Sequence, residues 1–99
     1  MTSPLSAEAR PRIGRLFRFQ WEPAQQAYVL LYPEGMVKLN QSAGEILRRC
    51  DGNCSVGEVV ADLERTFATS GLTGEVEAFL AMAEENGWVS WDSAAESAS

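Results

Sequence analysis

Histidine is absent from this chain of 99 residues, and only two cysteines are present, Cys50 and Cys54. Histidine is the commonest general base near neutral pH, so its absence excludes every catalytic arrangement that pairs it with serine or cysteine. A structural zinc site usually needs four ligands in two close pairs, which one cysteine pair does not supply. A radical-SAM cluster would need a third cysteine at position 57, which is Gly57. We therefore expect no catalytic residue, no metal and no cofactor, with Cys50 on the apolar face of a helix and Cys54 in a turn.

Basic residues are also scarce, since eight Lys and Arg stand against fourteen Asp and Glu, for a net charge of −6. Proteins bind phosphate backbones mainly with Lys and Arg, so this balance argues against nucleic acid as a partner. No apolar run approaches the roughly 20 residues that span a bilayer. The first eleven residues lack the apolar segment that follows the charges of a secretory signal. We expect a cytoplasmic protein without membrane contact, in which both cysteines stay reduced.

The two ends of the chain differ from the middle. Residues 1–11 and 93–99 are small, polar and aperiodic, which predicts flexible tails around one domain over residues 12–92. A domain of this size buries only about 60–65% of its unfolded surface, so nearly every apolar face is needed for the core.

Three strands are predicted in the first half of the domain, over residues 15–21, 27–32 and 36–39. Aromatic side chains alternate with other residues in the first, and β-formers dominate the second. Pro23 interrupts the chain between these two strands, and Pro33-Glu34-Gly35 provides a tight turn before the third. This order predicts an antiparallel meander in which the third strand is an exposed edge.

Three helices are predicted in the second half, over residues 40–50, 55–67 and 73–87. The second has the strongest apolar stripe, with Val56, Val59, Val60, Leu63 and Phe67 at helical spacing. Asn40 and Thr73 are expected to cap the first and third helices, and Ser55 with Glu58 forms a capping box for the second. Asn86-Gly87 ends the third helix. Residues 88–91 predict a short fourth strand or an extended tail.

A three-stranded antiparallel meander followed by three helices is a winged-helix-like α+β fold, which leaves several functional classes open, among them a small enzyme or an assembly scaffold. A winged-helix transcription regulator is the alternative, but it would need basic residues on its last helix. Residues 73–87 contain four Glu and no Lys or Arg. The acids of the second and third helices lie opposite apolar stripes and are expected to be solvated. An exposed edge strand instead favours a binding protein to which an extended peptide adds as a further strand.

One segment carries a family resemblance, Tyr32 to Asn40, which has the sequence YPEGMVKLN. Together with FRFQW at residues 17–21, SAGEIL at residues 42–47, Asp51-Gly52 and Gly87-Trp88, it covers residues 12–91 in order. The chain in this way resembles the PqqD family, the peptide chaperones of pyrroloquinoline quinone biosynthesis.

The resemblance implies a non-catalytic RiPP recognition element with a winged-helix-like fold. Such a protein binds the precursor peptide PqqA and presents it to PqqE, a radical-SAM enzyme that carries the clusters and the chemistry. The peptide would lie between the third strand and the third helix, so the implied binding residues are Met36, Val37, Lys38, Leu39, Val76, Phe79, Leu80 and Ala83. Some of the four helix residues must serve as core. An exposed edge also lets two copies pair as a homodimer.

Overall fold

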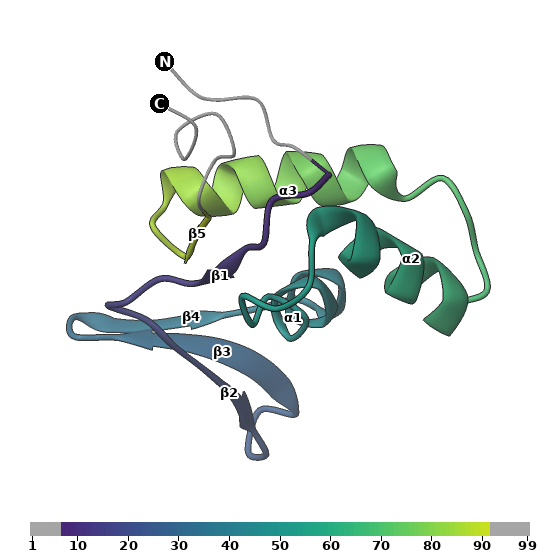
Figure 1. Cartoon of the computed structure of the whole chain (residues 1–99). Helices are drawn as coiled ribbons and strands as arrows, with labels where there is room; N and C mark the ends of the chain where they lie inside the picture. Colours follow the sequence, from purple (N-terminus) through teal and green to yellow (C-terminus); the bar gives the residue numbers. More distant parts are fainter. Residues whose placement is uncertain (1–6, 92–99) are drawn as a thin grey trace, which may run out of the picture.

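The computed structural model describes residues 7–91 and confirms the α+β fold, a three-stranded antiparallel sheet followed by three helices. The strands are β1 (Arg12–Ile13), β2 (Arg18–Glu22), β3 (Ala27–Tyr32), β4 (Gly35–Lys38) and β5 (Val89–Ser90). The helices are α1 (Gln41–Leu47), α2 (Val56–Thr66) and α3 (Thr73–Glu85). Figure 1 shows α3 across the top, the sheet β2-β3-β4 below, and α1 and α2 on the right between them.

The strand boundaries differ slightly from the prediction. The Phe17 N–H donates to the Gly14 carbonyl at 3.0 Å, so residues before Arg18 form a turn and β2 starts three residues later than predicted. The third strand of the meander begins at Gly35 and ends at Lys38. The Leu39 N–H still donates to the Tyr28 carbonyl at 3.0 Å, so the ladder with β3 continues one residue beyond β4.

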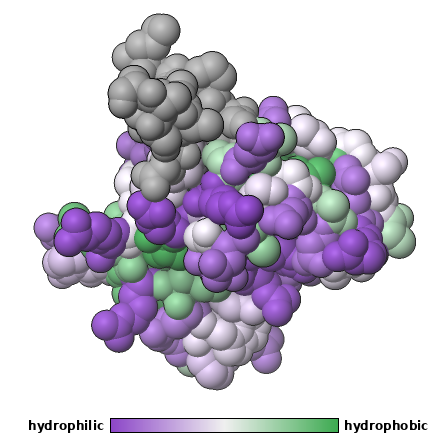
Figure 2. All heavy atoms as spheres, viewed as in Figure 1, coloured by the Kyte–Doolittle hydropathy of each residue, from purple (hydrophilic) through white to green (hydrophobic). Residues whose placement is uncertain are grey.

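The core lies between the inner face of the sheet and the helices, where Leu30, Leu47 and Val56 are almost completely buried. Tyr28 packs directly against α1 because Gly44 has no side chain, since a Cβ at Gly44 would lie 2.8 Å from the Tyr28 ring. On the face seen in Figure 2, hydrophilic residues predominate and hydrophobic residues come to the surface in small patches, one of them over the strands.

Local capping explains where most helices begin and end. The Asn40 side chain accepts from the Ala43 N–H at 2.8 Å, and the Ser55–Glu58 capping box is complete, as predicted. The predicted extension of the first helix to Cys50 is wrong, because α1 ends at Leu47. The Arg49 and Cys50 N–H groups bond three residues back and tighten the last turn.

The start of α3 also differs from the prediction. Leu72, and not Thr73, is the N-cap residue, and it makes no side-chain cap. Its N–H donates instead to the Glu64 carboxylate of α2 at 2.9 Å. At the other end, the predicted stop at Asn86-Gly87 is confirmed, and Gly87 has a φ of +77°. The Gly87 and Trp88 N–H groups donate to Glu84 and Ala83, each at 2.9 Å, which is the Schellman arrangement.

The predicted flexible N-terminal tail is wrong for residues 7–11, because this segment packs against α2. Ala9 and Pro11 are buried. The Ala9 carbonyl accepts from the Val56 N–H at 2.8 Å, and the Ala7 carbonyl accepts from the Gly57 N–H at 2.9 Å. The first N–H groups of a helix have no partner within it, so the N-terminal segment satisfies them. The predicted tail over residues 93–99 lies outside the described residues.

A second, two-stranded sheet joins the two ends of the domain. β1 pairs antiparallel with β5, so that Ile13 lies opposite Val89 and Arg12 opposite Ser90. Figure 1 shows this pair between α3 and the larger sheet. Of the strand and the extended tail left open for residues 88–91, the structure contains the strand, whose partner at residues 12–13 was not predicted. The pairing fixes the position of Trp88, which lines a groove beside β4.

Candidate functional site

Among residues 7–91, the outer strand β4 has a neighbour on one side only, since the order of the sheet is β2-β3-β4. The Tyr28–Leu39 pair is hydrogen-bonded, and antiparallel ladders alternate bonded and non-bonded pairs. The next bonded pair is therefore Leu30–Val37. Met36 and Lys38 fall between the bonded pairs, so their N–H and C=O groups point away from β3. β4 offers two donors and two acceptors along its open edge.

A groove beside this edge has a volume of about 710 Å³. One wall comes from β4 and the residue after it, namely Val37, Lys38 and Leu39. Another wall comes from α3, which contributes Val76, Phe79 and Met82. Its lining is predominantly apolar. The groove can therefore accept apolar side chains from a chain that pairs with β4.

The structure brings together five of the eight predicted binding residues, since Val37, Lys38, Leu39, Val76 and Phe79 all line the groove. Val76 and Leu39 form its floor, because they are only 2% and 5% exposed. Met36 lies on β4 with 43% of its surface exposed, outside the lining.

The other two predicted residues do not reach the groove. Leu80 and Ala83 are 0% exposed and belong to the hydrophobic core. Leu80 is turned about 100° from Phe79 around α3 and points to the interior. Ala83 lies one turn after Phe79 on nearly the same side of α3, and its short side chain is covered by the core. Their assignment to the binding surface is corrected accordingly.

Several groove residues were not predicted. Met82, Phe67 and Leu72 line the groove, as does Trp88, whose ring centroid lies 6.4 Å from that of Phe79. Phe67 ends the apolar stripe of α2, and Met82 lies at the side of the α3 stripe. The exposure of both is visible only in the folded chain, at 44% and 38%.

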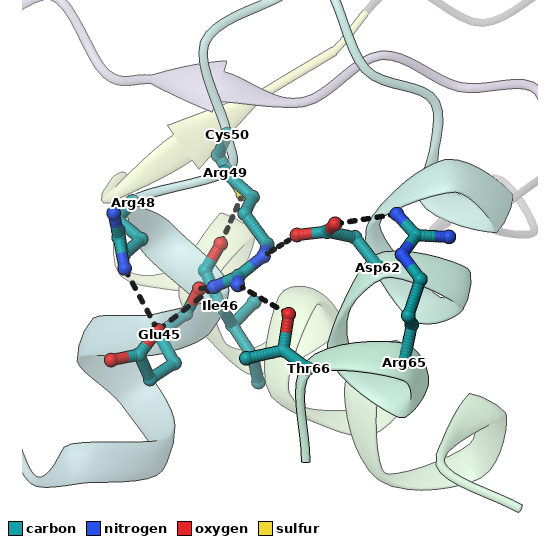
Figure 3. Close-up of polar contacts among 8 residues, drawn as sticks. All are labelled: Glu45, Ile46, Arg48, Arg49, Cys50, Asp62, Arg65 and Thr66. Atoms are coloured by element: carbon teal, nitrogen blue, oxygen red, sulfur yellow. Dashed lines mark hydrogen bonds and ion pairs between the residues drawn. The ribbon is translucent and has the colours of Figure 1, made fainter. Parts of the chain in front are cut away.

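A cluster of charged side chains joins α1 and the turn after it to α2 (Figure 3). The Arg49 guanidinium donates to the Glu45 carboxylate at 2.9 Å and also bonds the Asp62 carboxylate. Hydrogen bonds from Arg49 are the main reason why the pKa values of Glu45 and Asp62 are lowered. Arg65 holds the other side of Asp62 at 2.7 Å. Because Glu45 also lines the groove, this cluster fixes one part of its wall.

Acidification is expected to destabilise the fold through this cluster. The pKa values of Glu45 and Asp62 are lower in the folded than in the unfolded chain, so unfolding takes up protons. Above the pKa values of the unfolded chain, about 4, the two carboxylates contribute their full stabilisation. This stabilisation is lost as the pH falls through their lower pKa values in the folded chain. Urea midpoints measured from pH 7 to pH 3 should fall more steeply for the wild-type chain than for Arg49→Met. Equal pH dependence in the two proteins would contradict this role.

The two cysteines are both free and lie in different environments. Cys50 is buried, its thiol donates to the Ile46 carbonyl at 3.3 Å, and burial raises the pKa of this thiol to about 12. Cys54 is half-buried. Within residues 7–91 there is no group of three or more His, Cys, Asp or Glu side chains placed to hold a metal ion. None of the described helices has the length and apolar character needed to cross a membrane.

Comparison with known proteins finds a family that matches most of the described chain. The family described as "Coenzyme PQQ synthesis protein D (PqqD)" matches residues 27–89. A relative from Stutzerimonas stutzeri named "PqqA binding protein" is 50% identical over 80 residues, covering 80% of this chain and 87% of the relative. A relative of the same name from Azotobacter vinelandii is 52% identical over 80 residues, with the same coverage of both chains.

A solved structure has the same fold. It is the solution NMR structure of the PqqD truncation of Methylobacterium extorquens PqqCD, described as a functional and stand-alone RiPP recognition element. The two structures agree with a TM-score of 0.66 at 24% sequence identity, over 87% of this chain and 94% of the other. This similarity supports the arrangement of sheet and helices that forms the groove.

Proposed function

The chain belongs to the PqqD family of coenzyme PQQ synthesis proteins, and from this premise we propose that it binds the precursor peptide PqqA by strand addition at β4. The observation that carries the proposal is the open edge of β4, where the main-chain groups of Met36 and Lys38 point outward beside an apolar groove. In β-augmentation the main-chain ladder provides affinity, and pockets for alternate side chains provide specificity. The edge of β4 supplies the main-chain ladder, and the groove supplies the pockets.

The expected affinity is moderate. Two donors and two acceptors on β4 allow four ladder hydrogen bonds, each contributing about 1 kcal/mol. Two or three apolar side chains of the peptide add roughly 1.5–3 kcal/mol each on burial. The ordering of the peptide opposes these terms, and a net free energy of about −8 kcal/mol corresponds to micromolar binding. Such an affinity suits a carrier that must also release its peptide.

A proline at position 38 tests the strand edge. Lys38→Pro removes an N–H that points away from β3, so the fold should persist while PqqA binds about 5–10-fold more weakly. Lys38→Ala is the matched control, because it removes the same side chain and keeps the amide. Isothermal titration with PqqA measures both variants. If Lys38→Pro and Lys38→Ala bind PqqA equally well, the peptide does not pair with β4 at this residue.

The same register predicts a different outcome at the neighbouring position. The Val37 N–H faces β3, so Val37→Pro should break the sheet and lower stability. A circular-dichroism melt separates this effect from a loss of peptide contact at a folded edge.

The role of the complex is a further part of the proposal. The chain acts as a chaperone that presents PqqA to the radical-SAM enzyme PqqE, and the chemistry belongs to that enzyme. The relatives are named for binding PqqA, which supports a non-catalytic role. Co-elution of PqqA, this chain and PqqE in size-exclusion chromatography would support presentation. A change in the mass of PqqA produced by the isolated chain would contradict it.

We also propose a cytoplasmic location and no binding to nucleic acid. Residues 73–87 of the last helix contain no Lys or Arg, which argues against the winged-helix regulator as the alternative function. A mobility shift of DNA at low salt would revive that alternative. In the part of the chain that the structure describes, both outer strands, β2 and β4, have an open edge, so two copies can pair as a homodimer. If the pairing uses β4, PqqA should dissociate the dimer in light-scattering measurements.

A further inference from the structure

The groove extends beyond β4 to the turn between α2 and α3. Phe67, the C-cap residue of α2, lines this end with 44% of its surface exposed. The earlier members of the same stripe, such as Val59 and Leu63, are buried. Leu72 is half-buried and lines the same end, above a floor that includes Ile46. A large aromatic surface therefore remains open at the end of an apolar groove.

This end of the groove is held by hydrogen bonds. The Phe67 N–H donates to the Leu63 carbonyl at 3.0 Å. Glu64 fixes the turn twice, because its carbonyl accepts from the Thr69 N–H and its carboxylate from the Leu72 N–H, both at 2.9 Å. The backbone at Phe67 and Leu72 is thus held by the fold, and both residues line the groove.

The charges along the groove are distributed unevenly. Among the described residues that line it, the charged ones are Lys38, Glu45 and Glu75. Lys38 lies on β4, whereas Glu75 lies in the first turn of α3, three residues from Leu72. Glu45 is held by Arg48 and Arg49, while Glu75 forms no hydrogen bond or ion pair with a described residue. The Phe67 end therefore has an apolar interior and an unpaired carboxylate at its rim.

We propose that the Phe67 end is a second subsite for the bound peptide. It takes a large apolar side chain, and a basic residue stands next to that side chain in the peptide. The inference rests on the proposed function and adds which peptide residues the protein selects. The helical rise from Leu72 to Phe79 is about 10 Å, which an extended peptide spans in about three residues. The apolar residue therefore lies about three positions from the one that contacts Phe79.

Another explanation is that Phe67 is an ordinary exposed side chain. Single exposed apolar residues are common in soluble proteins, and Leu16 is a further example at 74% exposure. The two residues differ in their surroundings. Phe67 lines the groove beside β4, whereas Leu16 lines a separate hollow with Arg15 and Arg18. Leu16 is for this reason a matched control for the truncation of an exposed apolar residue.

The test is titration of PqqA into the full chain and its variants. Phe67→Ala should weaken binding about tenfold, the effect of a truncated aromatic anchor, while Leu16→Ala should bind as the wild type does. Glu75→Lys should weaken binding several-fold at low salt and less at high salt, because the interaction of exposed charges is screened. Apolar residues of PqqA should also be replaced by alanine one at a time. At one position the replacement should weaken binding to the wild-type chain but not to Phe67→Ala.

The outcomes separate the subsite from the proposed function. Wild-type affinity in Phe67→Ala would overturn the subsite and leave strand addition intact, whereas failure of the wild-type chain to bind PqqA would overturn the proposed function itself. If Phe67→Ala changed the oligomeric state of the chain without changing its affinity for PqqA, the Phe67 end would contact a second copy of the chain. That result would also overturn the subsite. If Phe67→Ala does not fold, intermolecular NOEs from the Phe67 ring to PqqA decide the question in the wild-type chain, and their absence counts against the subsite.

Discussion

Truncation of Leu80 to alanine is expected to lower the free energy of unfolding by about 3 kcal/mol. Leu80 is 0% exposed at the centre of α3 and belongs to the cluster that also contains Leu30, Leu47 and Val76. The variant loses the transfer free energy of the removed atoms and leaves a cavity that the neighbouring helices and sheet fill only in part. Since small domains are stable by about 5–15 kcal/mol, this is a large part of the total. Urea unfolding followed by circular dichroism measures the change.

Two other positions on the same helix serve as controls. Met82→Ala removes a side chain that is 38% exposed in the groove, so its cost in stability should stay below about 1 kcal/mol. Phe79→Ala should mainly weaken peptide binding, because Phe79 lines the groove. If Leu80→Ala were as stable as Met82→Ala, the assignment of Leu80 to the core would be wrong.

This contrast shows what helix periodicity can and cannot predict. The sequence places Val76, Phe79, Leu80 and Ala83 on one apolar face. The family resemblance implies a binding role for this face, but the sequence does not tell which of the four residues are core. An apolar stripe about 100° wide covers both the side chains that point straight inward and those at its edge. Only the position of the neighbouring elements separates them. Phe79 lines the groove beside β4, whereas Leu80 and Ala83 are buried in the core.

The fold was predicted best where the signal is local. Alternating aromatic residues, the Ser55–Glu58 capping box and the Asn86-Gly87 stop each act within a few residues, and the structure contains all of them. The β1–β5 pair joins residues more than 70 positions apart, and two-residue strands carry no periodic pattern. The N-terminal segment was missed for a related reason, because its contacts with α2 are made by main-chain carbonyls of residues without apolar periodicity.

Replacement of Gly14 by alanine is expected to destabilise the chain by about 3 kcal/mol, at the upper end of the usual cost of overpacking. A Cβ at Gly14 would lie 2.2 Å from the Gly87 carbonyl oxygen, a main-chain atom that cannot rotate away. The Gly14 N–H donates to the Trp88 carbonyl at 2.7 Å, so relief of the clash would break this bond and separate β1 from β5. Urea unfolding measures the loss.

Gly74→Ala is the matched control, because a Cβ at that exposed position of α3 meets no atom within 4 Å. Alanine is a better helix former than glycine, so this variant should be more stable by about 0.5–1 kcal/mol. Equal stability of the two variants would show that the contact between residues 14 and 87 is not tight. The clash has a functional consequence as well, since Gly87 precedes Trp88, whose ring lines the groove. At a temperature where Gly14→Ala remains folded, its affinity for PqqA should therefore fall, whereas that of Gly74→Ala should not, because the β1–β5 pair sets the position of one groove wall.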